Sequence, residues 1–365
     1  AGVVVCLLGF SHLQQFLQRG SFEETHKYAR SVRREGQNPV YRPLPEKHNG
    51  SLMEPLKEVR KQFRRKPLGS AKRLWPQVYL LGFPKTSTTS LFAFLHDHPQ
   101  LCAGVKEVHP HVFRTQKEPE FFTNERIGKG VQWYLDLFRN NERCERATHL
   151  RGKGSASFDA STQYIARSTE AIPLMASTIP KRFHSDLRFI VVVREPIARD
   201  LSWWKMIRSE NANGRRLELN VSANYTDFVL SNLNKSLTQQ HAKNPLHVGL
   251  FVQHLETLWA HFNRAQTMVL SFDTLHANFT DSIRRIASFL GVDFQPWEKK
   301  SKGEITGRRA KSVPQTDIDP EPCRLLKAFF LPYNTRFYEL MSMPGSPPEQ
   351  PQFPPFADPC PTSLQ

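Results

Sequence analysis

The sequence has few cysteines, and none at metal-binding or redox spacing. The five cysteines stand far apart along 365 residues and form no C-x-x-C pair, which argues against a zinc site and a redox dithiol. We therefore expect no metal. An odd number leaves at least one thiol unpaired, whereas Cys323 and Cys360 bracket a proline-rich tail and could be bridged in an oxidising compartment.

Acidic residues are also scarce. The chain has 34 of them against 50 lysines and arginines, so its formal net charge is +16. This charge predicts an anionic partner, which by charge alone could be a phosphate-bearing cofactor, an acidic polysaccharide, nucleic acid or a membrane surface. Because 39% of the residues are hydrophobic and 11% aromatic, the chain can build a packed α/β core.

The apolar segment at residues 1–10 is too short to span a bilayer. It is interpreted either as the remnant of a signal anchor or as a buried segment. Five N-x-[ST] sequons, three of them within residues 220–236, favour a lumenal protein. The sequons begin at Asn49, Asn220, Asn224, Asn234 and Asn278.

Composition divides the chain into three parts. Residues 1–76 are mostly polar and punctuated by proline, so they are interpreted as a stem. Its basic run at residues 57–66 is a solvated helix face or, less favoured, a polyanion-binding patch. Residues 77–341 form the folded domain. Residues 342–365 are a proline-rich tail, predicted to be loosely ordered and without regular structure.

The folded part alternates short apolar runs with helical patterns. Runs at residues 78–83, 187–193 and 267–272 predict strands, and the second is nearly continuous, as expected of a strand buried on both faces of a parallel sheet. Residues 280–290 predict a helix that ends at Gly291. This alternation indicates an α/β fold with a P-loop-like, doubly wound parallel sheet flanked by helices.

The turn after the first predicted strand has the composition of a phosphate site. Residues 81–91 read LGFPKTSTTSL, so a lysine and a row of hydroxyls precede a helix. The N–H groups of a helix N-terminus, the lysine charge and the hydroxyls would converge on one anion. The segment is not a Walker A loop, because Lys85 lies three residues after Gly82 and no second glycine follows. The candidate phosphate-binding residues are Lys85, Thr86, Ser87, Thr88 and Thr89.

This turn resembles the 5′-phosphosulfate loop of sulfotransferases that use 3′-phosphoadenosine 5′-phosphosulfate (PAPS), whose pattern is P-K-x-G-T-T-x-L. Ser87 stands where the family has glycine, which predicts less backbone freedom in the turn. The resemblance runs from about Val78 to Met341 and implies the sulfotransferase fold with PAPS as donor. The matching residues are Pro84, Lys85, Thr88, Thr89 and Leu91.

Two later segments resemble the rest of the family's nucleotide site. In the family, an arginine at the end of a strand and a serine eight residues later bind the 3′-phosphate, and Arg194 and Ser202 have that spacing. Arginine suits this role because its planar fork forms paired bonds to phosphate oxygens. Gly307, Arg308 and Arg309 resemble the basic glycine loop that closes over the nucleotide.

Residues 117–138 resemble the K-E-x-x-F-F and K-G-x-x-W-Y-x-x-x-F elements of Golgi carbohydrate sulfotransferases, which include heparan sulfate N- and 3-O-sulfotransferases and the N-acetylgalactosamine 4-sulfate 6-O-sulfotransferase. The resemblance implies that Glu118 is the general base and that Lys85 stabilises the leaving phosphate. Glu107 is a competing base, less favoured because the Phe-Phe and Lys-Gly-Trp-Tyr spacing follows Glu118. Lys153 aligns with a substrate-contacting lysine of the heparan enzymes, or else replaces an acidic residue of the galactosamine enzyme.

We therefore expect a PAPS-dependent carbohydrate O-sulfotransferase that acts on an acidic glycan and not on nucleic acid. Its expected location is the Golgi lumen, either secreted or held by a type II membrane anchor upstream. One alternative is a sulfotransferase for a small metabolite or lipid. Another is a P-loop kinase or NTPase, for which Asp273 is the nearby Mg²⁺ candidate. A third is a polyanion-binding module without catalysis.

Overall fold

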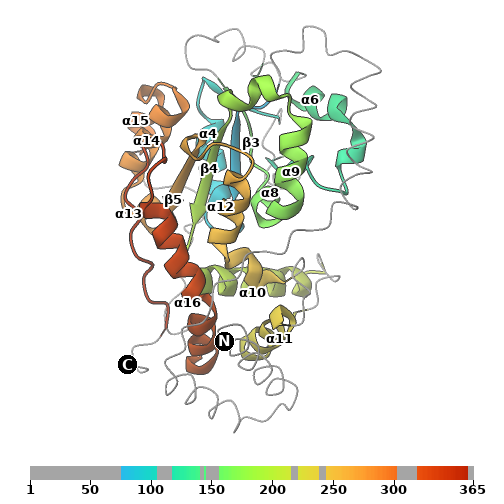
Figure 1. Cartoon of the computed structure of the whole chain (residues 1–365), viewed down its shortest axis with the longest axis vertical. Helices are drawn as coiled ribbons and strands as arrows, with labels where there is room; N and C mark the ends of the chain where they lie inside the picture. Colours follow the sequence, from blue (N-terminus) through green and yellow to red (C-terminus); the bar gives the residue numbers. More distant parts are fainter. Residues whose placement is uncertain are drawn as a thin grey trace, which may run out of the picture.

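The computed structural model describes residues 75–104, 117–139, 144, 156–214, 221–237, 244–301 and 319–360. Within these residues the chain forms a five-stranded sheet with helices on both faces (Figure 1). All neighbouring strands are parallel, in the order β2-β3-β1-β4-β5. The predicted α/β fold with a doubly wound parallel sheet is therefore confirmed.

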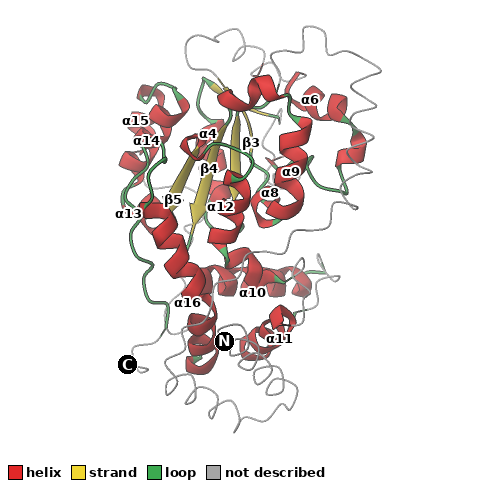
Figure 2. Ribbon diagram, in the orientation of Figure 1, coloured by secondary structure: helices red, strands yellow, loops and turns green. Residues whose placement is uncertain are grey.

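Helices fill the connections between short, buried strands (Figure 2). The strands are β1 (Val78–Gly82), β2 (Leu101–Ala103), β3 (Ala156–Asp159), β4 (Arg188–Val193) and β5 (Thr267–Ser271). The α-helices are α4 (Thr88–His96), α6 (Val131–Arg139), α8 (Gln163–Ala166), α9 (Ser168–Thr178), α10 (Pro196–Ala212), α11 (Tyr225–Leu237), α12 (Phe251–Trp259), α13 (Phe272–Ala277), α14 (Phe279–Leu290), α15 (Gln295–Ser301) and α16 (Pro320–Ser342). Short 3-10 helices are η2 (Ile127–Lys129), η3 (Lys181–Asp186), η5 (Pro245–Gly249) and η6 (Arg264–Gln266).

The three strands and the helix predicted from apolar patterns are present. Strands β1, β4 and β5 lie where the apolar runs predicted them, and α14 ends at Gly291 in the left-handed conformation, with φ 67°. Strands β2 and β3 were not predicted. They have three and four residues, which is too short for an alternating pattern to stand out in the sequence.

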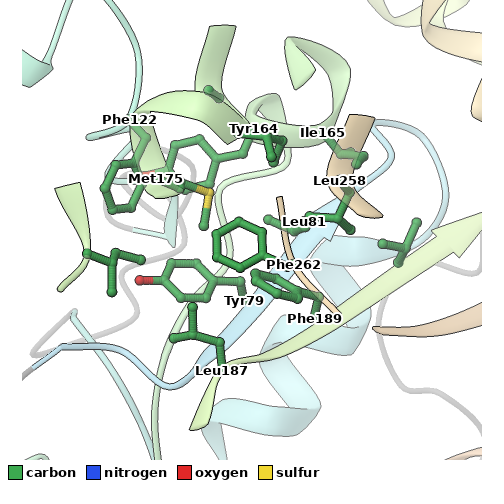
Figure 3. Close-up of a cluster of buried hydrophobic side chains, with 14 of the residues drawn as sticks. Tyr79, Leu81, Phe122, Tyr164, Ile165, Met175, Leu187, Phe189, Leu258 and Phe262 are labelled. Atoms are coloured by element: carbon green, nitrogen blue, oxygen red, sulfur yellow. The ribbon is translucent and has the colours of Figure 1, made fainter. Parts of the chain in front are cut away.

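Each face of the sheet is covered by its own apolar core. Tyr79 and Leu81 of β1 pack with residues of α8, α9 and α12, whereas Val78 and Leu80 pack with residues of α4 and α14. Figure 3 shows Tyr79 in the first of these cores, where its ring centroid lies 5.9 Å from that of Phe189. Burial on both faces is the reason that these strands are continuously apolar.

The strand order creates a topological switch point between β1 and β4, where the chain leaves the two neighbouring strands in opposite directions. After β1 the chain crosses to the β2 side of the sheet, and after β4 it crosses to β5 on the opposite side. Ligands of open α/β sheets bind outside the carboxyl ends of the strands at such a point. The turn at residues 84–87 follows β1 and Arg194 follows β4, so the two predicted half-sites are neighbours.

A third apolar cluster lies beyond the carboxyl ends of the strands, where α10 and α11 pack on the first half of α16 (Figure 1). A disulfide from Cys323 to Cys360 ties the end of the tail to this cluster, as the sequence allowed. A second disulfide joins Cys102 of β2 to Cys144. It was not predicted, because its partners are 42 residues apart and meet only through the fold.

The tail after α16 has no helix or strand through Cys360, as predicted, but it is not loosely ordered. The Gln350 side chain bonds the backbone N–H and carbonyl of Val269 on edge strand β5, at 2.7 and 2.6 Å. The Phe356 ring stacks on Phe337 with centroids 5.8 Å apart. The tail covers a strand edge that would otherwise present unpaired backbone groups, so the prediction of loose order is wrong for residues 343–360.

Candidate active site

The turn between β1 and α4 has a backbone conformation that favours glycine. Lys85 and Ser87 have φ values of 74° and 65°. The Thr86 side chain is buried and donates a hydrogen bond of 2.7 Å to the carbonyl of Phe83. The Thr86 hydroxyl therefore donates its proton to the backbone of the turn and stabilises the turn.

Helix α4 begins directly after this turn and points its N-terminus at the same place. Its N-cap residue, Ser87, makes no side-chain cap bond, and its first turn contains no acidic residue. Such a helix start favours an anion through its N–H groups and its dipole. Thr88 is buried and Thr89 is exposed. The five candidate phosphate-binding residues thus lie together in the turn and the first turn of α4.

Arg194 follows β4 and lies against this turn. One Nη donates to the carbonyl of Lys85 at 3.5 Å, and the guanidinium lies 4.4 Å from the centroid of the Phe272 ring. Burial lowers the pKa of Arg194, and the carboxylates of Asp273 and Glu195 oppose this effect. A buried guanidinium is stabilised by an anion, so the position fits a phosphate group.

Helix α10 starts at this point and contains Ser202. Glu195 caps the helix by accepting hydrogen bonds from the N–H groups of Ile197 and Ala198, at 3.1 and 2.6 Å. Burial raises the pKa of Glu195 to about 8 in spite of these two bonds. Ser202 is half-buried and lies two turns into the helix. Arg194 and Ser202 therefore stand on one strand-to-helix connection, as their spacing predicted.

Glu118 is held by a bond to each carboxylate oxygen. Lys117 donates to Oε1 at 2.9 Å, and the Thr162 hydroxyl donates to Oε2 at 3.1 Å. The Lys117 side chain is 2% exposed and that of Glu118 16%. A Cβ atom on Gly82 would lie 3.0 Å from the Thr162 carbonyl oxygen, so the backbone of Thr162 packs against the end of β1. Thr162 thereby brings Glu118 toward the turn that follows β1.

A buried carboxylate at the end of β3 supports this region. Asp159 accepts hydrogen bonds on Oδ2 from the hydroxyls of Tyr134 and Tyr164, at 2.7 and 3.0 Å. Its Oδ1 accepts from the N–H and the hydroxyl of Ser161, at 2.8 and 2.6 Å. The Ser161 hydroxyl oxygen in turn accepts the N–H of Glu120 at 2.9 Å. Asp159 therefore links α6, α8 and the segment that contains Glu118.

Glu120 is a second carboxylate of this segment, which the sequence reasoning did not select. Its backbone has φ 50°, and burial, followed by the nearby Glu118 charge, raises the pKa of its carboxyl group. Arg126 and Arg167 oppose the increase. The sequence does place Glu120 two residues after Glu118, in Lys-Glu-Pro-Glu, and this proximity could have made it a candidate. Sequence spacing could not show that Glu120 lies among charged side chains.

Several predicted residues lie outside the described residues. Among the residues that are described, no group of three or more histidine, cysteine, aspartate or glutamate side chains could hold a metal ion. In that same part of the chain, no helix has the length and apolar character needed to cross a membrane. The predicted residues outside the described part are Glu107, Lys153, Gly307, Arg308 and Arg309.

Comparison with known proteins identifies the family. A model described as the sulfotransferase domain matches residues 75–308, which is more than half of the chain. The chain belongs to the sulfotransferase domain family, and this domain implies PAPS as the sulfuryl donor. The kinase or NTPase alternative therefore loses its support.

The relatives in this comparison are distant. Heparan sulfate glucosamine 3-O-sulfotransferase 3B1 of Homo sapiens is 25% identical over 289 residues, which are 74% of this chain and 65% of the relative. The bifunctional heparan sulfate N-deacetylase/N-sulfotransferase of Drosophila melanogaster is 24% identical over 303 residues, 75% of this chain and 26% of the relative. The chain thus spans less than two thirds of either protein. A solved sulfotransferase from Alicyclobacillus acidocaldarius has 20% identity and a TM-score of 0.49, covering 73% of this chain and 95% of that one.

Proposed function

We propose that this sulfotransferase transfers the sulfuryl group of PAPS, in line, to a hydroxyl of an acidic glycan. The observation that supports this proposal most is the convergence of three groups at the carboxyl ends of the strands. The uncapped start of α4 follows β1, the buried Arg194 follows β4, and Glu118 is held beside the end of β1 through Thr162. Two anion-binding positions and one carboxylate are what this reaction needs.

The two anion-binding positions suit the two ends of the nucleotide. The turn at residues 85–89 would bind the 5′-phosphosulfate, because it combines a lysine, hydroxyls and helix N–H groups. Arg194 and Ser202 would bind the 3′-phosphate. Gly307, Arg308 and Arg309 are proposed to close over the nucleotide. PAPS supplies the sulfuryl group and leaves as 3′-phosphoadenosine 5′-phosphate (PAP).

Glu118 and Lys85 are the proposed catalytic residues. Glu118 would take the proton of the acceptor hydroxyl while the oxygen forms its bond to sulfur. The bonds from Lys117 and Thr162 fix the plane of the carboxylate for this task. Lys85 would stabilise the negative charge that develops on the bridging oxygen when the sulfur–oxygen bond to phosphate breaks. Lys153 is proposed as an additional contact to the sulfuryl group or the acceptor.

An acidic glycan is the acceptor class that the chain's properties favour. A net charge of +16 exceeds what one nucleotide requires and would attract a polyanion. The names of the two relatives describe heparan sulfate enzymes. Two disulfides and the sequons support a lumenal compartment such as the Golgi.

The test is transfer of radioactive sulfur from labelled PAPS to a panel of glycosaminoglycans and small alcohols. Lys85→Ala and Glu118→Gln should each reduce labelling by at least about a hundredfold, as general-base and charge-stabilising groups do. Glu339→Gln is the matched control, because Glu339 is an exposed glutamate of α16 whose carboxylate pairs with Arg336 on the surface of that helix, and it should label at the parent rate.

The outcomes separate the alternatives. Label in the glycosaminoglycan fraction that both substitutions abolish would support the proposal. Label confined to small alcohols would replace the glycan by a small metabolite or lipid. Binding of a polyanion without any transfer, unchanged in Glu118→Gln, would instead support a non-catalytic module.

A further inference from the structure

Ser87 contacts a histidine that lies 189 residues away in the sequence. The Ser87 hydroxyl is 3.2 Å from Nε2 of His276, and Nδ1 of His276 is 2.7 Å from the carbonyl oxygen of Phe272. A carbonyl oxygen only accepts, so Nδ1 bears the proton that forms this bond. In the neutral ring Nε2 is then an acceptor, and the Ser87 hydroxyl donates to it.

This bond occurs at the position where the turn departs from the family pattern. Ser87 replaces the family's glycine but keeps a left-handed backbone, with φ 65°. Its hydroxyl does not cap α4, although serine is a favoured N-cap residue. The hydroxyl binds His276 instead, so the side chain that constrains this position also anchors it to another part of the domain.

Helix α13, which contains His276, also supports the second half-site. The Phe272 ring lies under the Arg194 guanidinium, at 4.4 Å, and 4.1 Å from the His276 ring, measured between centroids. One short helix at the end of β5 therefore contacts both the turn after β1 and the arginine after β4. Displacement of this helix would move both groups.

We propose that His276 is a positioning residue for nucleotide binding, which holds the phosphate-binding turn through the Ser87 hydroxyl. This inference rests on the proposed PAPS site. The hydrogen bond to His276 compensates for the missing glycine. A glycine at this position adopts the left-handed conformation at no cost, whereas Ser87 is held in that conformation by its bond to His276. His276 acts through Ser87 and takes no part in bond formation.

The test is a double-substitution cycle with PAP affinity, measured by titration calorimetry, as the readout. His276→Ala should weaken PAP binding about fivefold to tenfold, because Ser87 then keeps a disfavoured backbone conformation without its partner. Ser87→Gly is the second background of the cycle, and its own PAP affinity is the reference there, because glycine accepts the same conformation unaided. In the Ser87→Gly background, His276→Ala should therefore have little further effect.

His184→Ala is the matched control. His184 is also half-buried and bonds a backbone carbonyl, that of Ile179 at 2.9 Å, but it precedes the start of β4 at the opposite end of the sheet. It should leave PAP affinity at the parent value. In steady-state assays, His276→Ala should raise the KM for PAPS and leave the KM for the acceptor unchanged, which a general loss of stability would not do.

Two results would overturn the inference while leaving the proposed function intact. One is parent-like PAP affinity in His276→Ala, and the other is an equal loss of affinity with serine or glycine at position 87. Failure of the parent protein itself to bind PAP would overturn the proposed function, and the positioning role would fall with it.

Discussion

Asp159→Asn tests whether one buried carboxylate stabilises the domain around the segment that contains Glu118. Asp159 is 2% exposed and accepts four hydrogen bonds, two on each oxygen. An asparagine of the same shape retains one oxygen and replaces the other with a donor. Two of the four donors would then face an N–H group in a site closed to water.

The expected destabilisation follows from the number of hydrogen bonds that the substitution removes. Hydrogen bonds to a charged group contribute about 1.5–3 kcal/mol each, so the loss of two costs roughly 3–6 kcal/mol. The tyrosine hydroxyls of Tyr134 and Tyr164 can rotate to accept the new N–H bonds, which recovers about 0.5–1.5 kcal/mol each. Burial disfavours the charged form, as the raised pKa of Asp159 shows, and asparagine avoids this cost. We expect a net loss of about 2 kcal/mol in the free energy of unfolding.

Urea denaturation followed by circular dichroism measures this loss as a lower midpoint at an unchanged slope. Asp136→Asn is the control, because Asp136 accepts bonds from Gln132 and Arg139 on the exposed face of α6, and it should cost less than about 0.5 kcal/mol. A loss below about 1 kcal/mol in Asp159→Asn would refute the reasoning, since it would mean that the two bonds to the charged oxygen contribute no more than the neutral bonds that replace them.

Three further predictions concern other parts of the domain. Arg194→Lys should weaken PAP binding about tenfold, because lysine lacks the paired donors of arginine; unchanged affinity by calorimetry would count against a phosphate at this position. Burial raises the pKa of Asp200 to about 6. The folded state therefore holds a proton that the unfolded chain has lost, and the free energy of unfolding from this group falls as pH rises from about 4 to 6. Asp200→Asn should flatten that part of the urea-midpoint profile, and an unaltered slope would contradict the pKa. Joint replacement of Cys323 and Cys360 by serine should cost about 2–4 kcal/mol, visible as a lower Tm by calorimetry; a parent-like Tm would show that the tail is held without the disulfide.

The elements of the proposed nucleotide half of the site could largely be predicted from sequence, because they are local. An apolar run, a hydroxyl-rich turn and a helix follow one another within residues 78–96, and Arg194 and Ser202 stand on one strand-to-helix connection. Local order of this kind is visible as composition and spacing. Parallel strands bring such connections to one edge of the sheet, so the two halves could be expected to meet.

The proposed acceptor half of the site depends on contacts that sequence spacing does not reveal. Glu118 is oriented by Thr162, and Asp159 at the end of β3 draws its donors from α6, from α8 and from Ser161 in the turn after β3. Strand β3 was too short to be predicted, so its place beside β1 was unknown, and with it the surroundings of Glu118.

The sequence by itself determined the class of fold, the hydroxyl-rich turn after β1 and the place of Arg194 and Ser202 on one strand-to-helix connection, because each depends on residues close together in the chain. Only the tertiary structure decided which distant segments support them. The strand order brings His276 to Ser87, Cys102 to Cys144 and Gln350 to the edge of β5. The physical reason is that such contacts are set by packing between elements, and packing depends on sheet order and not on local pattern.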